Sequence, residues 1–219
     1  ANDVNQSLMR MRQIVGLAKV DTTVDYVTDW IEQHDEEAVL LHAGTPNEIK
    51  AKPKIVVFIH HIDVGTVLCA QLDNELKARG FNPCVRLEGG LDGSTSAEIE
   101  RRFREEPNNR VLVASTLAAG EGKNFQFCSD AVLMERQWNP PNEEQAEARF
   151  PRPGTTASQV NVMYPVAIGT VDEILTELVE KKRTYLATTK GEWSNAAESE
   201  IMKEIADRLA SEGRMKWRA

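Results

Sequence analysis

From residue 54 onward the sequence alternates between short apolar runs and amphipathic stretches, and this alternation limits the fold more than any other feature. Residues 54–59 form a continuous run rich in β-branched side chains, which is typical of a strand buried on both faces. Residues 64–79 have the apolar spacing of an amphipathic helix, and Gly80 is suited to end it. Strands and helices that alternate in this way favour βαβ crossovers. We therefore expect an α/β fold in which helices flank a parallel sheet.

The same two patterns place the other elements of the chain. Strands are expected at residues 83–87, 111–115, 131–135 and 160–166, and Pro165 favours an edge position for the last of them. Helices are expected at residues 5–15, 21–33, 94–105, 171–187 and 195–211, with a short helix just before Arg149. Residues 42–54 have little periodicity, so we expect a linker there. The chain then divides into N-terminal helices and linker at 1–53, a lobe at 54–187 and an appended helical tail at 188–219.

Composition and charge exclude several classes of protein. The chain is 41% hydrophobic and 27% charged, which is typical of a globular domain. No apolar run approaches the roughly 18 residues that a membrane span requires. Cys69, Cys84 and Cys128 form no CxxC pair, so free thiols in a reducing compartment are favoured over a disulfide framework. The net charge of −8 counts against a protein that grips nucleic acid over its whole surface, but it allows a local basic face.

Polar residues follow several of the expected strands, and in parallel sheets ligands gather at the carboxyl ends of strands. These strand-end pairs are His60 and His61, Glu88 and Gly89, Ser115 and Thr116, and Glu135 and Arg136. The two histidines have no carboxylate or thiol at metal-ligand spacing, so a hydrogen-bonding or structural role is favoured over a metal site.

A glycine-rich segment follows the strand at 111–115, and its small residues would let the backbone approach a phosphate. It is not a P-loop, because Leu117 stands five residues before Gly122 and Asn124 follows Lys123. It also lacks the third glycine of a dinucleotide fingerprint. A plain tight turn remains the alternative for this segment.

The segment 138–154 carries Arg149 and Arg152 three residues apart, in a proline-flanked stretch after the short helix. A guanidinium group is a planar fork of donors that stays charged, and such groups can neutralise charge on a transferring phosphoryl group. A solvated helix end with ordinary surface charges is the alternative. Trp138, at the start of the segment, could pack internally or lie against a nucleic-acid strand.

In this order, the segments resemble the second RecA-like lobe of Swi/Snf-type DNA translocases in helicase superfamily two. The annealing-helicase-like members and their bacterial and phage relatives are the most similar. The likeness covers roughly residues 5 to 187. Residues 8–14 resemble the helix that enters the lobe, 54–61 motif IV and 115–124 motif V. Residues 138–154 resemble the Trp-Asn-Pro segment that runs into motif VI, and 86–89 and 169–174 match further family segments.

The resemblance implies a role for each matching residue. Gln145, Arg149 and Arg152 fall on motif VI, whose arginines act as fingers toward ATP on the first lobe. It also implies that the nucleotide lies near Gly120, Gly122, Glu88 and Gly89. The residues implied to contact DNA are His60, Ser115, Thr116, Lys123, Asn124 and Trp138. No metal ligand is assigned.

Several positions depart from the family pattern, among them Pro151 in place of His and Pro153 in place of Ile. The chain also lacks a Walker A motif and a Walker B acidic pair after a strand, so we expect it not to hydrolyse ATP alone. The resemblance implies that ATP with Mg²⁺ is held mainly by an absent N-terminal RecA-like lobe, and that duplex or branched DNA is the other partner. It places the protein in the cytoplasm of a bacterium or phage-infected cell, or in a eukaryotic nucleus, and away from membranes.

Two alternatives remain open on the sequence alone. The first is a catalytically decayed lobe that serves as a protein-interaction or regulatory module, which the altered positions around Arg152 suggest. The second is an unrelated nucleotide-dependent α/β enzyme, such as a group transferase.

Overall fold

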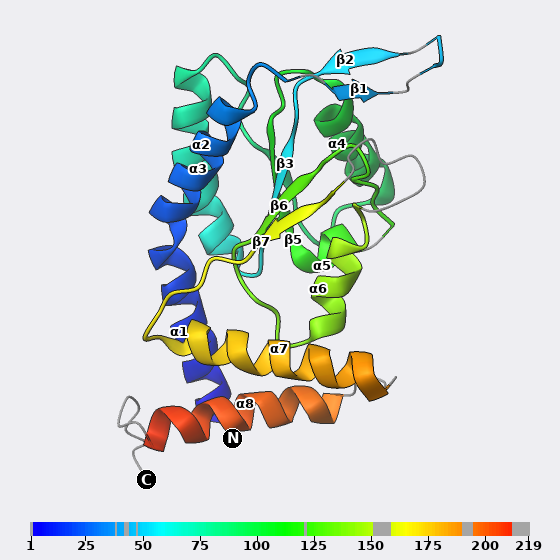
Figure 1. Ribbon diagram of the computed structural model, residues 1–219. Helices are drawn as coiled ribbons and strands as arrows, with labels where there is room; N and C mark the ends of the chain where they lie inside the picture. Colours follow the sequence, from blue (N-terminus) through cyan, green and yellow to red (C-terminus); the bar gives the residue numbers. More distant parts are fainter. Residues whose placement is uncertain are drawn as a thin grey trace.

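The computed structural model describes residues 2–37, 39–41, 44–46, 48–120, 122–150, 159–189 and 195–211. Its centre is a five-stranded sheet in the order β4-β5-β3-β6-β7, and every neighbouring pair is parallel (Figure 1). The strands are β3 (Ile55–Ile59), β4 (Val85–Leu87), β5 (Val111–Ser115), β6 (Asp130–Leu133) and β7 (Asn161–Met163). The parallel α/β fold that the alternation predicts is confirmed, and β7 lies at the sheet edge before Pro165, as expected.

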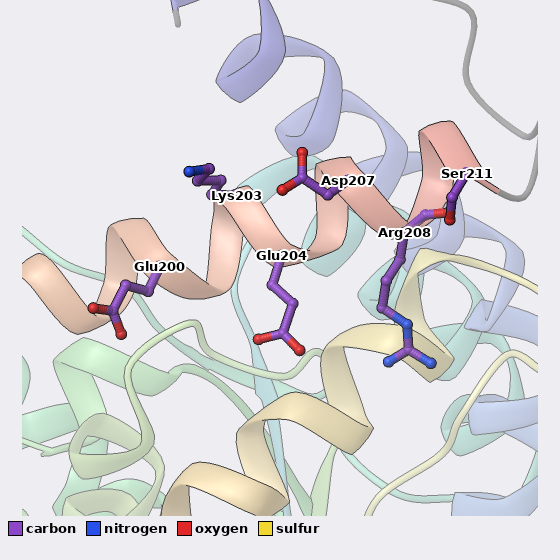
Figure 2. A pocket seen from close by; sticks show the side chains of 6 residues that line it. All are labelled: Glu200, Lys203, Glu204, Asp207, Arg208 and Ser211. Atoms are coloured by element: carbon purple, nitrogen blue, oxygen red, sulfur yellow. The ribbon is translucent and has the colours of Figure 1, made fainter.

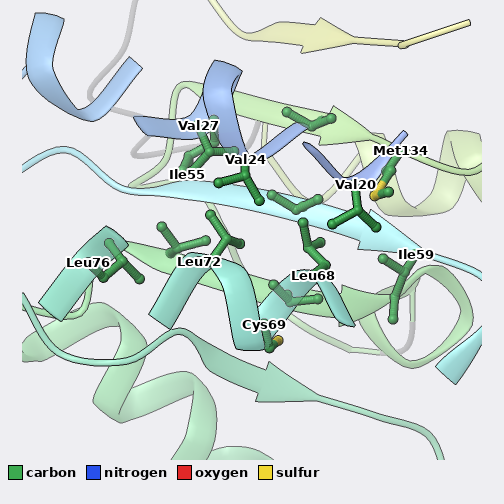
Figure 3. Close-up of a cluster of buried hydrophobic side chains, with 14 of the residues drawn as sticks. Val20, Val24, Val27, Ile55, Ile59, Leu68, Cys69, Leu72, Leu76 and Met134 are labelled. Atoms are coloured by element: carbon green, nitrogen blue, oxygen red, sulfur yellow. The ribbon is translucent and has the colours of Figure 1, made fainter. Parts of the chain in front are cut away.

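Helices cover both faces of the sheet, because alternate side chains of each strand point to opposite faces. On one face, Val57 of β3 packs in a cluster with α2 (Val20–Gln33) and α3 (Ile62–Ala78), as Figure 3 shows for the neighbouring residues of this cluster. On the other face, Val56 and Phe58 pack with α4 (Gly93–Glu105), α5 (Thr116–Gly120) and α6 (Pro140–Glu147). The strands are therefore buried on both sides, which explains their unbroken apolar sequence.

A third apolar cluster joins the two ends of the chain. Helix α1 (Asn2–Ala18) packs against α7 (Val171–Thr189) and α8 (Asn195–Ser211) beside the sheet (Figure 1). Leu8 from α1, Leu175 from α7 and Ile205 from α8 are buried together in this cluster. The N-terminal helix and the C-terminal helix thus share one core with the segment that follows β6, because Trp138 belongs to the same cluster.

Two local features differ from the expectations. The linker predicted at residues 42–54 is wrong at its C-terminal end, because β2 (Ile49–Ala51) pairs antiparallel with β1 (Val39–Leu41) as a two-stranded sheet. A strand this short has too few residues to show periodicity, and its partner supplies the stability. The glycine-rich segment begins with the short helix α5, which was not predicted from the sequence. Within the described residues, no helix is long and apolar enough to cross a bilayer.

Candidate functional site

The carboxyl ends of β3, β5 and β6 meet at one edge of the sheet, because Ile59 pairs with Ser115 and Phe58 with Leu133. This edge brings together three segments that are far apart in the sequence: the residues after β3, the glycine-rich segment after β5 and the loop after β6. Polar side chains at such an edge are the usual place for a ligand in a parallel sheet.

Three of the predicted site residues form a group where α5 and α6 lie side by side (Figure 1). Arg149 donates a hydrogen bond from Nη2 to the carbonyl of Gly120, at the end of α5. Gln145 lies beside the same glycine: a Cβ at Gly120 would be 3.7 Å from Gln145 Cβ and Oε1. We call Gly120, Gln145 and Arg149 the α5–α6 group. The structure therefore places together one residue predicted near the nucleotide and two predicted in motif VI.

Arg149 is half-buried rather than extended into solvent. Its Nε atom is buried and has no hydrogen-bond partner among the described residues. Its backbone carbonyl accepts a 2.9 Å hydrogen bond from the amide of Phe125, so the end of α6 is also tied to the glycine-rich segment. Arg152 lies outside the described residues, and its predicted role stays a prediction.

A buried ion pair fixes the start of α6. Pro140 and Pro141 occupy the first turn, where the missing amide hydrogen of proline costs nothing. Glu143 is 0% exposed; it accepts two hydrogen bonds from Arg136, at 2.9 and 2.8 Å, and one from the amide of Gln137 at 2.7 Å. Burial opposes the charge on Arg136, but Glu143 and Glu180 outweigh it and raise the pKa of the guanidinium. These contacts position the helix that carries Gln145 and precedes Arg149.

The glycine-rich segment uses several of its polar groups internally. The Thr116 hydroxyl is buried, donates to the Ile59 carbonyl at 3.1 Å and accepts from Gln137 Nε2 at 3.3 Å. Because that hydroxyl is occupied inside the protein, the predicted DNA contact of Thr116 is not available in this geometry. Lys123 donates to the Ser96 hydroxyl of α4, and Gly122 has a φ of 66°, where glycine is favoured.

Other predicted residues of the segment remain accessible. Ser115 and Asn124 are half-buried, and Asn124 Oδ1 accepts from the amide of Gln126 at 3.2 Å. At the neighbouring strand β4, Glu88 pairs with Arg86, and Gly89 is exposed with open space where a Cβ would lie. Glu88 and Gly89 thus sit at the same sheet edge, but Glu88 already has a cationic partner.

The His60–His61 turn after β3 is held by the carboxylate of Glu135, which the sequence placed at a strand end without giving it a role. Glu135 Oε2 accepts hydrogen bonds from the amides of His60 at 2.7 Å and His61 at 2.9 Å, and Oε1 lies 2.6 Å from His61 Nδ1. Burial raises the pKa of Glu135, but the hydrogen bonds from His61 and His60 outweigh it and leave the pKa lowered. The only sequence signal was a charged residue directly after a buried strand.

The surroundings of His60 favour the neutral form of its imidazole ring. Burial, together with the electrostatic effect of Arg12 and His61, lowers the pKa of His60 to about 4. Its Nδ1 lies 3.1 Å from Gln137 Oε1, which fits a neutral ring that donates from this nitrogen. Among the residues that the structure describes, no group of three or more His, Cys, Asp or Glu could hold a metal ion.

Trp138 is a packing residue, which corrects the predicted DNA contact. Its ring is 4% exposed and lies in the cluster with Leu8, and the Arg12 guanidinium sits 4.4 Å from the ring centroid. A base needs an exposed aromatic face to stack on, and this ring has none.

A shallow hollow of about 430 Å³ lies elsewhere on the molecule, over α8 (Figure 2). The six described residues that line it all come from this one helix, and Arg208 among them donates to Glu177 of α7 at 2.9 Å. None of these six residues belongs to the α5–α6 group.

Comparisons with known proteins identify the family to which this chain belongs. The family model described as the helicase conserved C-terminal domain matches residues 35–154. Human DNA annealing helicase and endonuclease ZRANB3 is 31% identical over 155 residues, which are 71% of this chain and 13% of that protein. A Xenopus tropicalis SWI/SNF-related regulator of chromatin, subfamily A-like protein 1, is 28% identical over 165 residues, 75% of this chain and 15% of that protein.

The fold also matches a solved structure of the same kind. The C-terminal part of the Fun30 ATPase domain superposes with a TM-score of 0.58 at 20% identity, over 74% of this chain and 48% of that one. The chain spans only 13% and 15% of the two curated relatives described above. The chain belongs to the helicase conserved C-terminal domain family, as a second RecA-like lobe of the Swi/Snf type.

Proposed function

We propose that this chain is the second lobe of an ATP-dependent DNA translocase, and that it completes an ATP site whose other wall is the first lobe. The observation that carries the proposal is the α5–α6 group, where Gln145 and Arg149 meet Gly120 at the carboxyl edge of the sheet. Two relatives of this chain are named as a DNA annealing helicase and a regulator of chromatin, and these names support DNA as the substrate.

In this proposal, the hydrogen bond between Arg149 and the glycine-rich segment depends on whether a nucleotide is bound. Its Nη2 donates to the neutral Gly120 carbonyl. A phosphate oxygen is a stronger acceptor, because hydrogen bonds between charged groups are roughly twice as strong as neutral ones. When the first lobe presents a phosphate, Arg149 would exchange one partner for the other and release Gly120. Arg152 would act as the second finger, and Mg²⁺ bound with ATP would neutralise phosphate charge.

DNA contacts would come from the same edge of the sheet. Ser115, Lys123, Asn124 and His60 remain candidates for the DNA backbone, whereas Thr116 and Trp138 are omitted because they are buried. Contacts of this kind fix the position of a protein on the duplex and carry little base information. A neutral His60 would act as a hydrogen-bond donor rather than as a cation.

The finger role is tested by ATP turnover of the full-length protein with and without duplex DNA. We expect Arg149→Ala and Arg152→Ala each to lower DNA-stimulated turnover by about a hundredfold or more. The matched control is Arg102→Ala, since Arg102 is an exposed arginine of α4 whose one ion pair among the described residues is with Glu106. Turnover of Arg149→Ala equal to that of Arg102→Ala would remove the role of Arg149.

A decayed interaction module is the second candidate, and Pro151 and Pro153 on either side of Arg152 favour it. Proline fixes the backbone on both sides and could place the guanidinium out of reach of a phosphate. This candidate predicts no ATP turnover by the full-length protein with any DNA, together with stable binding of a protein partner.

A further inference from the structure

Glu135 is the most heavily connected acidic side chain at the carboxyl edge of the sheet. It is 4% exposed, and its two carboxylate oxygens face two backbone amides and one imidazole nitrogen, all from the His60–His61 turn. The neighbouring Gln137 adds a second link, with Oε1 3.1 Å from His60 Nδ1 and Nε2 3.3 Å from the Thr116 hydroxyl. The loop after β6 therefore forms hydrogen bonds both with the residues that follow β3 and with the residue that follows β5.

Helix α1 closes over this carboxylate at a glycine. A Cβ built at Gly16 would lie 2.7 Å from Glu135 Oε1 and 2.9 Å from Val64 Cγ2, so only glycine fits without a shift. One turn earlier on the same helix, Arg12 donates to the carbonyl of Arg136 and covers the Trp138 ring. Leu8, another turn earlier, is buried with Trp138. One face of α1 thus runs along residues 135–138.

The loop at residues 135–138 leads directly into α6. Arg136 and the amide of Gln137 bind Glu143 in the first turn of that helix, and Arg149 follows its last turn. A shift of α1 along its own axis would therefore move the carboxylate of Glu135, the His60–His61 turn and the start of α6 together. The strands of the sheet pair separately through their own backbones.

We propose that Glu135 is a positioning residue that locks the His60–His61 turn to the loop leading into α6, and that the contact of Gly16 with its carboxylate lets α1 set this lock. The consequence for DNA rests on the proposed function, in which His60 lies against the DNA backbone. Through this lock, the position of α1 would determine whether the His60–His61 turn faces DNA while the α5–α6 group faces the first lobe.

The lock is tested in the full-length protein with Gly16→Ala and Glu135→Gln. Gly93→Ala is the control, because Gly93 is the first residue of helix α4 and a Cβ built there meets nothing within 4 Å beyond its chain neighbours and the backbone of its own helix. Both substitutions replace a helical glycine by alanine, and only the methyl group at position 16 meets the Glu135 carboxylate. The first readout is amide hydrogen exchange at His60 and His61.

We expect exchange at these two amides to rise about tenfold or more in Gly16→Ala and Glu135→Gln, as for loss of a hydrogen bond to a charged group. Exchange in β5 should stay unchanged, and Gly93→Ala should match the parent protein. The shorter side chain of Glu135→Asp should reduce the effect of Gly16→Ala in the double variant, because it withdraws the carboxylate from the new methyl group. Equal exchange in Gly16→Ala and Gly93→Ala would overturn the lock.

The second readout is the DNA concentration that half-saturates ATP turnover. We expect it to rise about fivefold or more in the two lock variants, as for loss of a hydrogen bond from His60 to a charged phosphate oxygen. A purely structural role would lower the maximal turnover through the folded fraction and leave this concentration unchanged, which would overturn the link to DNA. If the parent protein shows no DNA-stimulated turnover, the proposed function fails, and hydrogen exchange still decides the lock.

Discussion

At the scale of single residues, a few buried charged side chains fix the position of the loop between β6 and α6. Burying a charge is costly unless a partner compensates for it, so a buried ion pair requires one geometry. Arg136 and Glu143 form such a pair, and Glu135 meets the same requirement through three hydrogen-bond donors. Because these partners come from different elements, single residues fix the loop between β6 and α6.

Removing the charge at position 143 should therefore destabilise the protein far more than removing a surface charge. We expect Glu143→Gln to lower the free energy of unfolding on the order of 3 kcal/mol, because the Arg136 guanidinium stays buried without its carboxylate. The control is Glu180→Gln, since the Glu180 side chain is 51% exposed and pairs with the same arginine. Its expected cost is about 0–1 kcal/mol. Urea denaturation would measure both, and equal values would contradict this account of Glu143.

At the scale of elements, the helices at the two ends of the chain behave as one layer. Helices α1, α7 and α8 share the cluster that also buries Trp138. The loop at residues 135–138 therefore depends on packing by α8, although α8 follows this loop by more than fifty residues in the sequence. Electrostatic contacts between α7 and α8, such as that of Arg208 with Glu177, are exposed and contribute little.

Ile205→Ala in α8 should lower the free energy of unfolding by about 2–5 kcal/mol, because it leaves a cavity in this cluster. The matched control is Lys203→Ala, an exposed position on the same helix, for which we expect a change within about 0.5 kcal/mol. Thermal or urea unfolding followed by circular dichroism would give both values. If Ile205→Ala unfolded like the control, α8 would not be part of the cooperative core.

At the scale of the whole molecule, the chain presents polar groups at one edge of a five-stranded sheet. Walker A and Walker B sequences are absent from the chain. We expect the isolated chain to show no ATP turnover and to bind ATP with a Kd weaker than micromolar, since a second lobe supplies only part of the site. Isothermal titration calorimetry would measure this, and micromolar affinity would instead favour an independent nucleotide-dependent enzyme.

The sequence by itself determined the elements whose signals are local. The strand at Val111–Ser115 and the helix at Asn195–Ser211 have the predicted bounds. The parallel sheet was predicted from the alternation of strands and helices along the chain. Apolar periodicity is a property of neighbouring residues, so one sequence is enough to recognise it.

Only the tertiary structure decided which residues meet. It paired β1 with β2, buried the Trp138 ring and the Thr116 hydroxyl, and brought Glu135 to His61 across more than seventy positions of the chain. It also placed Gly16 against that carboxylate, a contact with no trace in the local pattern of α1. Ion pairs, strand partners and close packing join segments that are distant in sequence. Their geometry therefore exists only once the sheet and its two helical layers have assembled.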